Sequence, residues 1–79
     1  NPTRDKFTIS LQEQCHEARL EIYSIDGKLI HLKNHIASSN SNFSYDFNIN
    51  EMPNVKKGNV YLCRLHANKN VHYLKLIVQ

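Results

Sequence analysis

Apolar and polar residues alternate with a period of two in several short segments of this sequence, and that alternation restricts the fold more than any other feature. It occurs at residues 7–11 and 18–23, and most clearly at 43–49, where every second residue is Phe, Tyr or Ile. Successive side chains of a β-strand point to opposite faces, so the alternation predicts strands with one buried face and one exposed face.

Asp26-Gly27 predicts a hairpin turn, because both residue types tolerate the positive φ of a tight turn. The segment 18–23 precedes this turn, and we expect the partner strand at 29–33. Residues 11–22 also place apolar side chains at helical spacing, so a helix is the alternative there. No capping residue flanks that stretch and the hairpin needs a strand on both sides, so the strand is favoured.

A second hairpin is predicted near the end of the sequence, where Asn68-Lys69 joins strands at 60–67 and 70–78. A two-residue turn there pairs Leu65 with His72 and Tyr61 with Leu76. This register is favoured over that of a three-residue turn because it gathers apolar side chains on one face. Those side chains are Tyr61, Cys63, Leu65, Leu74 and Leu76.

The pattern as a whole predicts an all-β fold, a small antiparallel β-sandwich of six or seven strands. Its 79 residues suffice for one domain over 1–79 but not for two. Polar stretches at 37–42 and 50–59 are expected to be loops. The predicted core consists of Phe7, Ile9, Leu20, Ile22, Phe43, Tyr45 or Phe47, Tyr61, Leu65, Leu74 and Leu76.

Charge and hydropathy argue against a nucleic-acid partner and a transmembrane segment. The net charge is only +3 and the basic residues are spread along the chain, whereas small nucleic-acid binders concentrate them. The aromatic residues at 43–47 are interleaved with Ser44 and Asp46, and an acidic residue opposes phosphate binding. The longest apolar run, 60–63, is too short to cross a bilayer.

The residues that bind metals or perform catalysis show no recognisable arrangement. Cys15 and Cys63 lack the short spacing of a zinc site, and two buried free thiols are favoured over one long-range disulfide. In the predicted register His66 and His72 face opposite sides of their hairpin. No nucleophile motif frames a catalytic set, so we expect no enzyme activity, cofactor or metal. The histidines are His16, His31, His35, His66 and His72.

Three short motifs follow one another along the chain. Asn1-Pro2 precedes the first alternating segment. Residues 20–29 have the form aliphatic-x-Ile-Tyr-x-x-x-Gly-Lys-aliphatic, which includes Tyr23, Asp26 and Gly27. The last motif is a glycine followed by Tyr-aliphatic-x-Arg-aliphatic and then a Lys-aliphatic run. Its residues are Gly58, Tyr61 to Leu65, and Lys75 to Val78.

The order of these motifs resembles the type A C-terminal sorting domain of the type IX secretion system of Bacteroidetes, over nearly the whole chain. Two departures are visible. Gly58 stands three residues before Tyr61, where members usually show two, and the connection 51–57 is longer and more charged than usual. Both concern the conformation of that loop. Neither cysteine occupies a position that the family motif reserves for cysteine, so both are expected to be unpaired.

The resemblance implies an Ig-like sandwich that serves as a non-catalytic address label for a cargo located upstream. The first residue is Asn, so we expect the chain to be a fragment or a processed product. The implied partners are an outer-membrane translocon, a shuttle protein and a sortase that usually removes the domain. The implied location is the periplasm in transit, then the cell surface or the medium.

The resemblance also implies which residues matter. Residues expected to be recognised by the machinery are Gly58, Tyr61, Arg64, Leu74, Lys75, Leu76, Ile77, Val78 and Gln79. Residues expected to hold the fold are Asn1, Pro2, Tyr23, Asp26 and Gly27. An Ig-like or fibronectin-like adhesion module is the alternative; a sorting signal is the last domain of its parent protein, whereas an adhesion module can stand anywhere in it.

Overall fold

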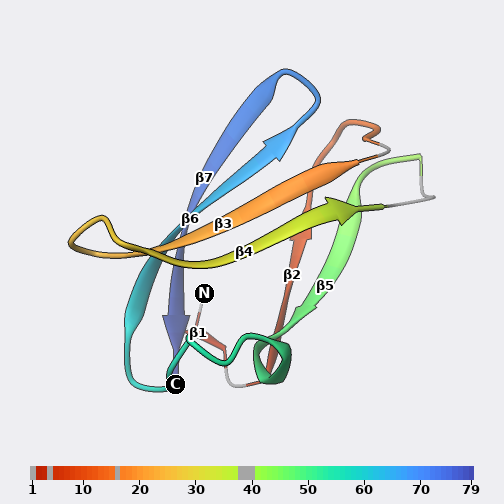
Figure 1. The fold of residues 1–79 in the computed structure, drawn as a ribbon. Coiled ribbons are helices and arrows are strands. Elements are labelled where there is room, and N and C mark those ends of the chain that lie inside the picture. The colour runs from red at the N-terminus through yellow and green to blue at the C-terminus, as the bar shows by residue number, and fades with distance from the viewer. Residues whose placement is uncertain (1, 4, 16, 38–40) are drawn as a thin grey trace.

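The chain folds into two β-sheets that pack face to face (Figure 1). The computed structural model describes residues 2–3, 5–15, 17–37 and 41–79. Within these residues it contains β1 (Pro2–Thr3), β2 (Lys6–Ser10), β3 (Ala18–Ser24), β4 (Leu29–Ile36), β5 (Ser44–Asn48), the 3-10 helix η1 (Ile49–Glu51), β6 (Val60–Ala67) and β7 (Asn70–Val78). Asn1 lies outside the described residues.

The larger sheet has five strands in the order β1-β7-β6-β3-β4, and the smaller one pairs β2 with β5. The prediction of a small all-β sandwich is confirmed. One pairing departs from the predicted antiparallel arrangement, because β1 runs parallel to β7, with Pro2 opposite Ile77 and Thr3 opposite Val78. Local sequence patterns predict hairpins, but they carry no information about a contact between the two ends of the chain.

The β6–β7 hairpin has the predicted register. Leu65 lies opposite His72 and Tyr61 opposite Leu76, and Ala67 and Asn70 close the two-residue turn. Asn68 adopts a φ of +57° in that turn. Asparagine is among the few residues with a side chain that tolerate this conformation.

The β3–β4 hairpin also forms at the predicted turn. Gly27 takes a φ of +92°, and its N–H donates to the carbonyl of Ser24 at 3.0 Å. The Ser24 hydroxyl donates a hydrogen bond to the Asp26 carboxylate, and this bond is the main reason that the pKa of Asp26 lies below its ordinary value. The helical alternative for residues 11–22 is wrong, since 18–22 belong to β3 and none of the described residues before them is helical.

The strand after that turn is longer than predicted and runs to Ile36, where 29–33 was expected. Its pairing with β3 shifts register between Ala18 and Leu20. His35 sits at this irregularity with a φ of +55°, and its Nδ1 lies 2.7 Å from a carboxylate oxygen of Glu17. A bulge interrupts the alternation of apolar and polar residues. The sequence pattern therefore predicted a strand that ends before this bulge.

Both sheets contribute to one hydrophobic core. Phe47, rather than Tyr45, is the fully buried aromatic of β5, while Phe7 and Leu74 pack against the core and are only half-buried. The predicted loop 50–59 contains the end of η1 and contributes two buried side chains. The buried residues are Ile9, Cys15, Ala18, Leu20, Ile22, Ile36, Phe43, Phe47, Ile49, Met52, Val55, Tyr61, Cys63, Leu65, Ala67, Leu76 and Val78.

Cys15 and Cys63 are both buried free thiols, as predicted. The Cys15 thiol donates a hydrogen bond to the carbonyl of Glu17 at 3.0 Å, whereas burial raises the pKa of the Cys63 thiol to about 12. Among the described residues, no helix has the length and hydrophobicity needed to cross a membrane.

Candidate functional site

The first and the last sequence motifs, which lie far apart in the chain, meet at the carboxyl end of β7. The N–H of Gly58 donates to the carbonyl of Val78 at 2.8 Å, and the N–H of Val78 donates to the carbonyl of Asn59 at 3.0 Å. On the other side of the strand, Pro2 of the first motif lies opposite Ile77. The positive φ of Gly58, +84°, turns the chain so that its N–H faces β7.

Tyr61 faces the core and is only 5% exposed. Its hydroxyl oxygen accepts a hydrogen bond from the N–H of Lys56 at 2.8 Å. The side chain therefore shapes the loop that leads to Gly58, and its burial leaves the ring no surface to offer a partner.

The other predicted recognition residues alternate along β7 between core and surface. Leu76 and Val78 are buried, Leu74 and Ile77 are half-buried, and Lys75 and Gln79 are exposed. The apolar members thus anchor the strand in the sandwich. The polar members reach solvent.

Along most of its outer edge, β7 has no strand partner among the described residues. Because the N–H and the carbonyl of Val78 face Asn59 and Gly58, the alternation of a strand directs the backbone groups of Val71, Tyr73 and Lys75 away from β6. In the described part of the chain, only Pro2–Thr3 pairs with this edge, at Ile77 and Val78. An open strand edge is a template for pairing with another chain.

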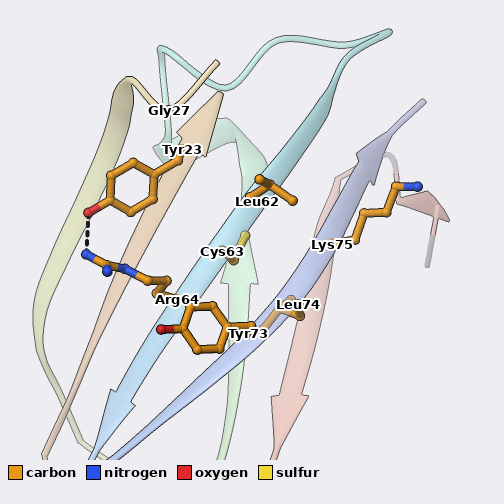
Figure 2. A pocket seen from close by; sticks show the side chains of 8 residues that line it. All are labelled: Tyr23, Gly27, Leu62, Cys63, Arg64, Tyr73, Leu74 and Lys75. Carbon is orange, nitrogen blue, oxygen red and sulfur yellow. Dashed lines mark hydrogen bonds between the residues drawn. The ribbon is translucent and has the colours of Figure 1, made fainter. Parts of the chain in front are cut away.

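Side chains on the outer face of the large sheet form a shallow groove of about 500 Å³ (Figure 2). β3 contributes Tyr23, β6 contributes Leu62 and Arg64, and β7 contributes Tyr73 and Lys75; these five residues are called the outer-face groove below. Tyr73 is 73% exposed and Leu62 is 47% exposed, so two large apolar surfaces face solvent here. Cys63, Leu74 and Gly27 complete the lining.

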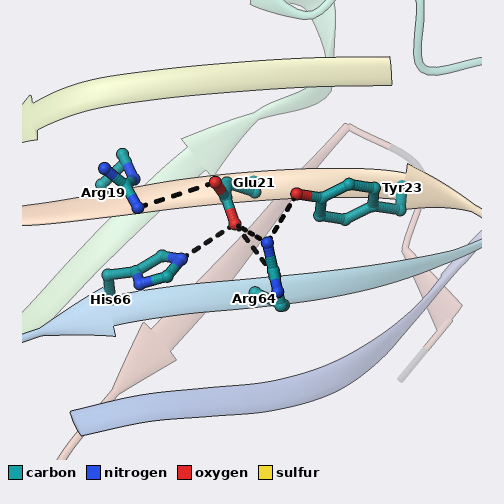
Figure 3. A network of polar contacts seen from close by, with 5 residues as sticks. All are labelled: Arg19, Glu21, Tyr23, Arg64 and His66. Atoms are coloured by element: carbon teal, nitrogen blue, oxygen red, sulfur yellow. Dashed lines mark hydrogen bonds and ion pairs between the residues drawn. The ribbon is translucent and has the colours of Figure 1, made fainter. Parts of the chain in front are cut away.

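A polar network built around Glu21 fixes one wall of this groove (Figure 3). The side chain of Glu21 is only 13% exposed, and its Oε1 lies 2.8 Å from an Arg64 terminal nitrogen and 2.8 Å from His66 Nε2. Arg64 also donates to the Tyr23 hydroxyl at 2.7 Å, and its guanidinium lies 5.0 Å from the Tyr23 ring centre. Arg19 approaches the second carboxylate oxygen of Glu21 at 3.7 Å.

The network keeps both central groups charged. Burial by itself raises the pKa of Glu21, but hydrogen bonds from His66 and Arg64 outweigh it, so the pKa lies below its ordinary value. Hydrogen bonds to Tyr23 and Glu21 raise the pKa of Arg64. The guanidinium, which is charged at any physiological pH, is thereby held in place.

Sequence reasoning missed Glu21, Leu62 and Tyr73 as parts of this surface. The alternation at 18–23 puts Glu21 on the exposed face of its strand but does not say what it contacts there. The missing information was the pairing of β3 with β6, which puts Glu21 opposite Arg64 and Tyr23 opposite Leu62. Tyr73 could have been found, because the predicted hairpin register already put it opposite Arg64.

The described residues hold no group of three or more metal-ligating side chains. Three histidines are each paired with one glutamate instead: His35 with Glu17, His66 with Glu21, and His72 with Glu13. Each of these pairs offers a structural contact, and the His66 pair belongs to the network around Glu21.

The family model for the secretion system C-terminal sorting domain matches residues 1–79. The chain belongs to that family. The resemblance to type IX secretion sorting domains is thereby confirmed. No curated protein and no solved structure matches the chain.

In this member of the sorting-domain family, the motif residues lie either at the end of β7 or in the outer-face groove. Gly58, Tyr61 and the apolar residues of β7 build and anchor the end of the strand. Tyr23, Arg64 and Lys75, from two different motif blocks, line the same surface groove. The sorting domain therefore presents one continuous surface made of the β7 edge and the outer-face groove.

Proposed function

We propose that residues 1–79 form a single non-catalytic sorting domain that directs an upstream cargo through the type IX secretion system, with β7 as the element that the machinery recognises. A shuttle protein and an outer-membrane translocon bind the domain during its passage from the periplasm. A sortase then removes it at the cell surface, leaving the cargo there or in the medium.

One observation carries this proposal: the first and the last motif blocks meet at the end of β7, and the rest of the strand keeps an edge that no described strand covers. Pro2 and Gly58 fix its end, while the backbone groups of Val71, Tyr73 and Lys75 face outward. A partner that adds a strand to this edge gains main-chain hydrogen bonds without rearranging the domain. The family membership favours this function over the adhesion module.

The export of a reporter fused in front of the domain tests the role of the edge. Lys75→Pro removes an N–H that points away from β6, and proline is tolerated at such edge positions. We expect this variant to reduce surface display by about tenfold. The loss of one main-chain hydrogen bond to the partner strand weakens binding by about 1–2 kcal/mol. Lys75→Ala, which keeps the N–H, is the matched control for the side chain.

Thermal unfolding of the purified variants shows whether the domain still folds. Deleting residues 76–79 should also trap the reporter in the periplasm, but it removes buried Leu76 and Val78, so its folding must be checked first. Exchanges at Asp46 and His35 should leave export intact. Wild-type display of the folded Lys75→Pro variant would refute recognition by strand addition at this edge.

A further inference from the structure

The charges of the sorting domain are distributed very unevenly along the sequence. All seven acidic residues lie at or before position 51, and the last of them is Glu51. The remaining 28 residues, 52–79, carry no acidic side chain and include both β6 and β7. Their basic residues are Lys56, Lys57, Arg64, Lys69 and Lys75. The hairpin that bears the motif residues is therefore a purely basic part of the chain.

Only part of this positive charge is neutralised within the domain. Glu21, which comes from β3, pairs with Arg64 and His66. Lys75 has no carboxylate partner among the described residues and is exposed at the rim of the outer-face groove (Figure 2). Its ammonium group extends away from Tyr73 toward solvent, and no salt bridge to a described carboxylate neutralises it (Figure 2).

We propose that the outer-face groove, together with the adjoining β7 edge, binds an extended acidic segment of a polypeptide partner that also carries an apolar side chain. This inference rests on the proposed function and names the chemistry of the partner at that surface. The partner's backbone pairs with Val71, Tyr73 and Lys75. Its carboxylate meets Lys75, and its apolar side chain lies on Tyr73 and Leu62.

Strand geometry makes the two parts of this surface act together. The residues whose backbone groups face the open edge are the same ones whose side chains face the groove: Tyr73 lies opposite outward-facing Arg64, and Lys75 opposite outward-facing Leu62. In an added antiparallel strand, the residue opposite Tyr73 therefore projects its side chain on the groove side. A partner strand of about five residues fills the edge up to the point where β1 begins to pair.

Other occupants fit this surface less well. A second copy of the chain brings the same basic hairpin and a net charge of +3, so two such edges repel each other. An anionic oligosaccharide could contact Lys75 and the tyrosine rings, but it has no peptide groups to pair with the open edge. The free backbone groups next to the groove favour a polypeptide.

The pentapeptide Glu-Ser-Phe-Ser-Glu, acetylated and amidated, is a suitable probe. Titrated into the isotope-labelled 79-residue chain, it should shift the backbone NMR signals of Leu62, Tyr73 and Lys75 saturably. The expected Kd is about 1 mM, as befits a shallow surface and a short ligand. Lys-Ser-Phe-Ser-Lys is the charge-reversed control peptide.

Lys75→Glu should weaken binding of the acidic peptide by about tenfold or more, because it turns an attraction into a repulsion. Lys69→Glu is the matched variant: it changes the net charge equally, but at the hairpin turn six residues away, about 20 Å along the strand. Tyr73→Ser should weaken binding of both peptides. These expectations concern the purified chain, so they stand or fall separately from export.

Three results would overturn the inference. One is equal binding of the acidic and basic peptides, another is a set of shifted signals on β2 and β5, and the third is stronger binding of trigalacturonate than of the acidic peptide. If the peptide binds as expected while all edge variants are exported normally, the groove is a binding site but the proposed recognition of β7 is wrong.

Discussion

At the scale of single residues, Glu21 shows how one carboxylate organises a surface. Its side chain lies mostly buried on the outer face of the large sheet. Its carboxylate accepts hydrogen bonds from Arg64 Nε at 2.9 Å and His66 Nε2 at 2.8 Å. Removing its charge leaves a guanidinium without its partner. That arrangement makes stability depend on pH.

We expect Glu21→Gln to lower the free energy of unfolding at pH 7 by about 1–2 kcal/mol, a value between those of exposed ion pairs and of charged hydrogen bonds. The folded-state pKa of Glu21 is lowered from 4.5, so its contribution is present above pH 4.5 and is lost as the pH falls through the folded-state value. Urea titrations at pH 7 and pH 3 measure the difference. Glu17→Gln, at an exposed pair, should change little. A Glu21→Gln deficit of equal size at both pH values would contradict the electrostatic explanation.

Gly27 is the second informative residue. A Cβ placed there meets nothing within 4 Å, so its φ of +92° is the only obstacle to a side chain. Gly27→Val should therefore cost about 1–3 kcal/mol of stability through backbone strain alone. Gly27→Asn should cost less, because asparagine tolerates positive φ. Thermal unfolding ranks the two variants, and equal losses would mean that something other than φ is at work.

At the scale of elements, β7 is a strand with one paired side and one open side. The N–H groups of Leu74 and Leu76 face β6, whereas those of Tyr73 and Lys75 face solvent. Hydrogen exchange followed by NMR should show the outward amides exchanging roughly 10-fold faster or more than their inward neighbours. Equal protection of Tyr73 and Leu74 would mean that the edge is already covered in solution.

At the scale of the whole molecule, one core ties the sheets together and encloses both thiols. Cys15 and Cys63 are each 1% exposed, and the pKa of Cys63 is raised to about 12. A thiol reagent needs an accessible thiolate, so it has to wait for the fold to open.

Iodoacetamide at pH 8 should therefore modify the folded chain roughly 100-fold more slowly than the urea-unfolded chain. Mass spectrometry counts the modified thiols, and both should become reactive in the same unfolding transition. A mass two protons lower in the absence of reductant would reveal a disulfide and refute the free thiols. Rapid modification of the folded chain would show that the core is less closed than its burial indicates.

The sequence by itself determined the features that depend on residues close together in the chain, namely the strands, the turns and the hairpin register. Alternation predicted β2, β3 and β5, while the Asn68-Lys69 turn and the apolar face that it creates predicted β6, β7 and their register. These features follow from side-chain direction and backbone preference within a few residues. The glycine at position 27 is also a local feature. Its positive φ alone favours glycine there, since an added Cβ would meet no other atom within 4 Å.

Only the tertiary structure decided which distant strands become neighbours. It put Glu21 beside Arg64, 43 positions later in the sequence, and it set Pro2 against Ile77. Such pairings depend on the loop-closure entropy and the packing of the entire core, and no short stretch of sequence encodes them. The groove and its charged wall arise from these long-range contacts, so alternation alone could not reveal them.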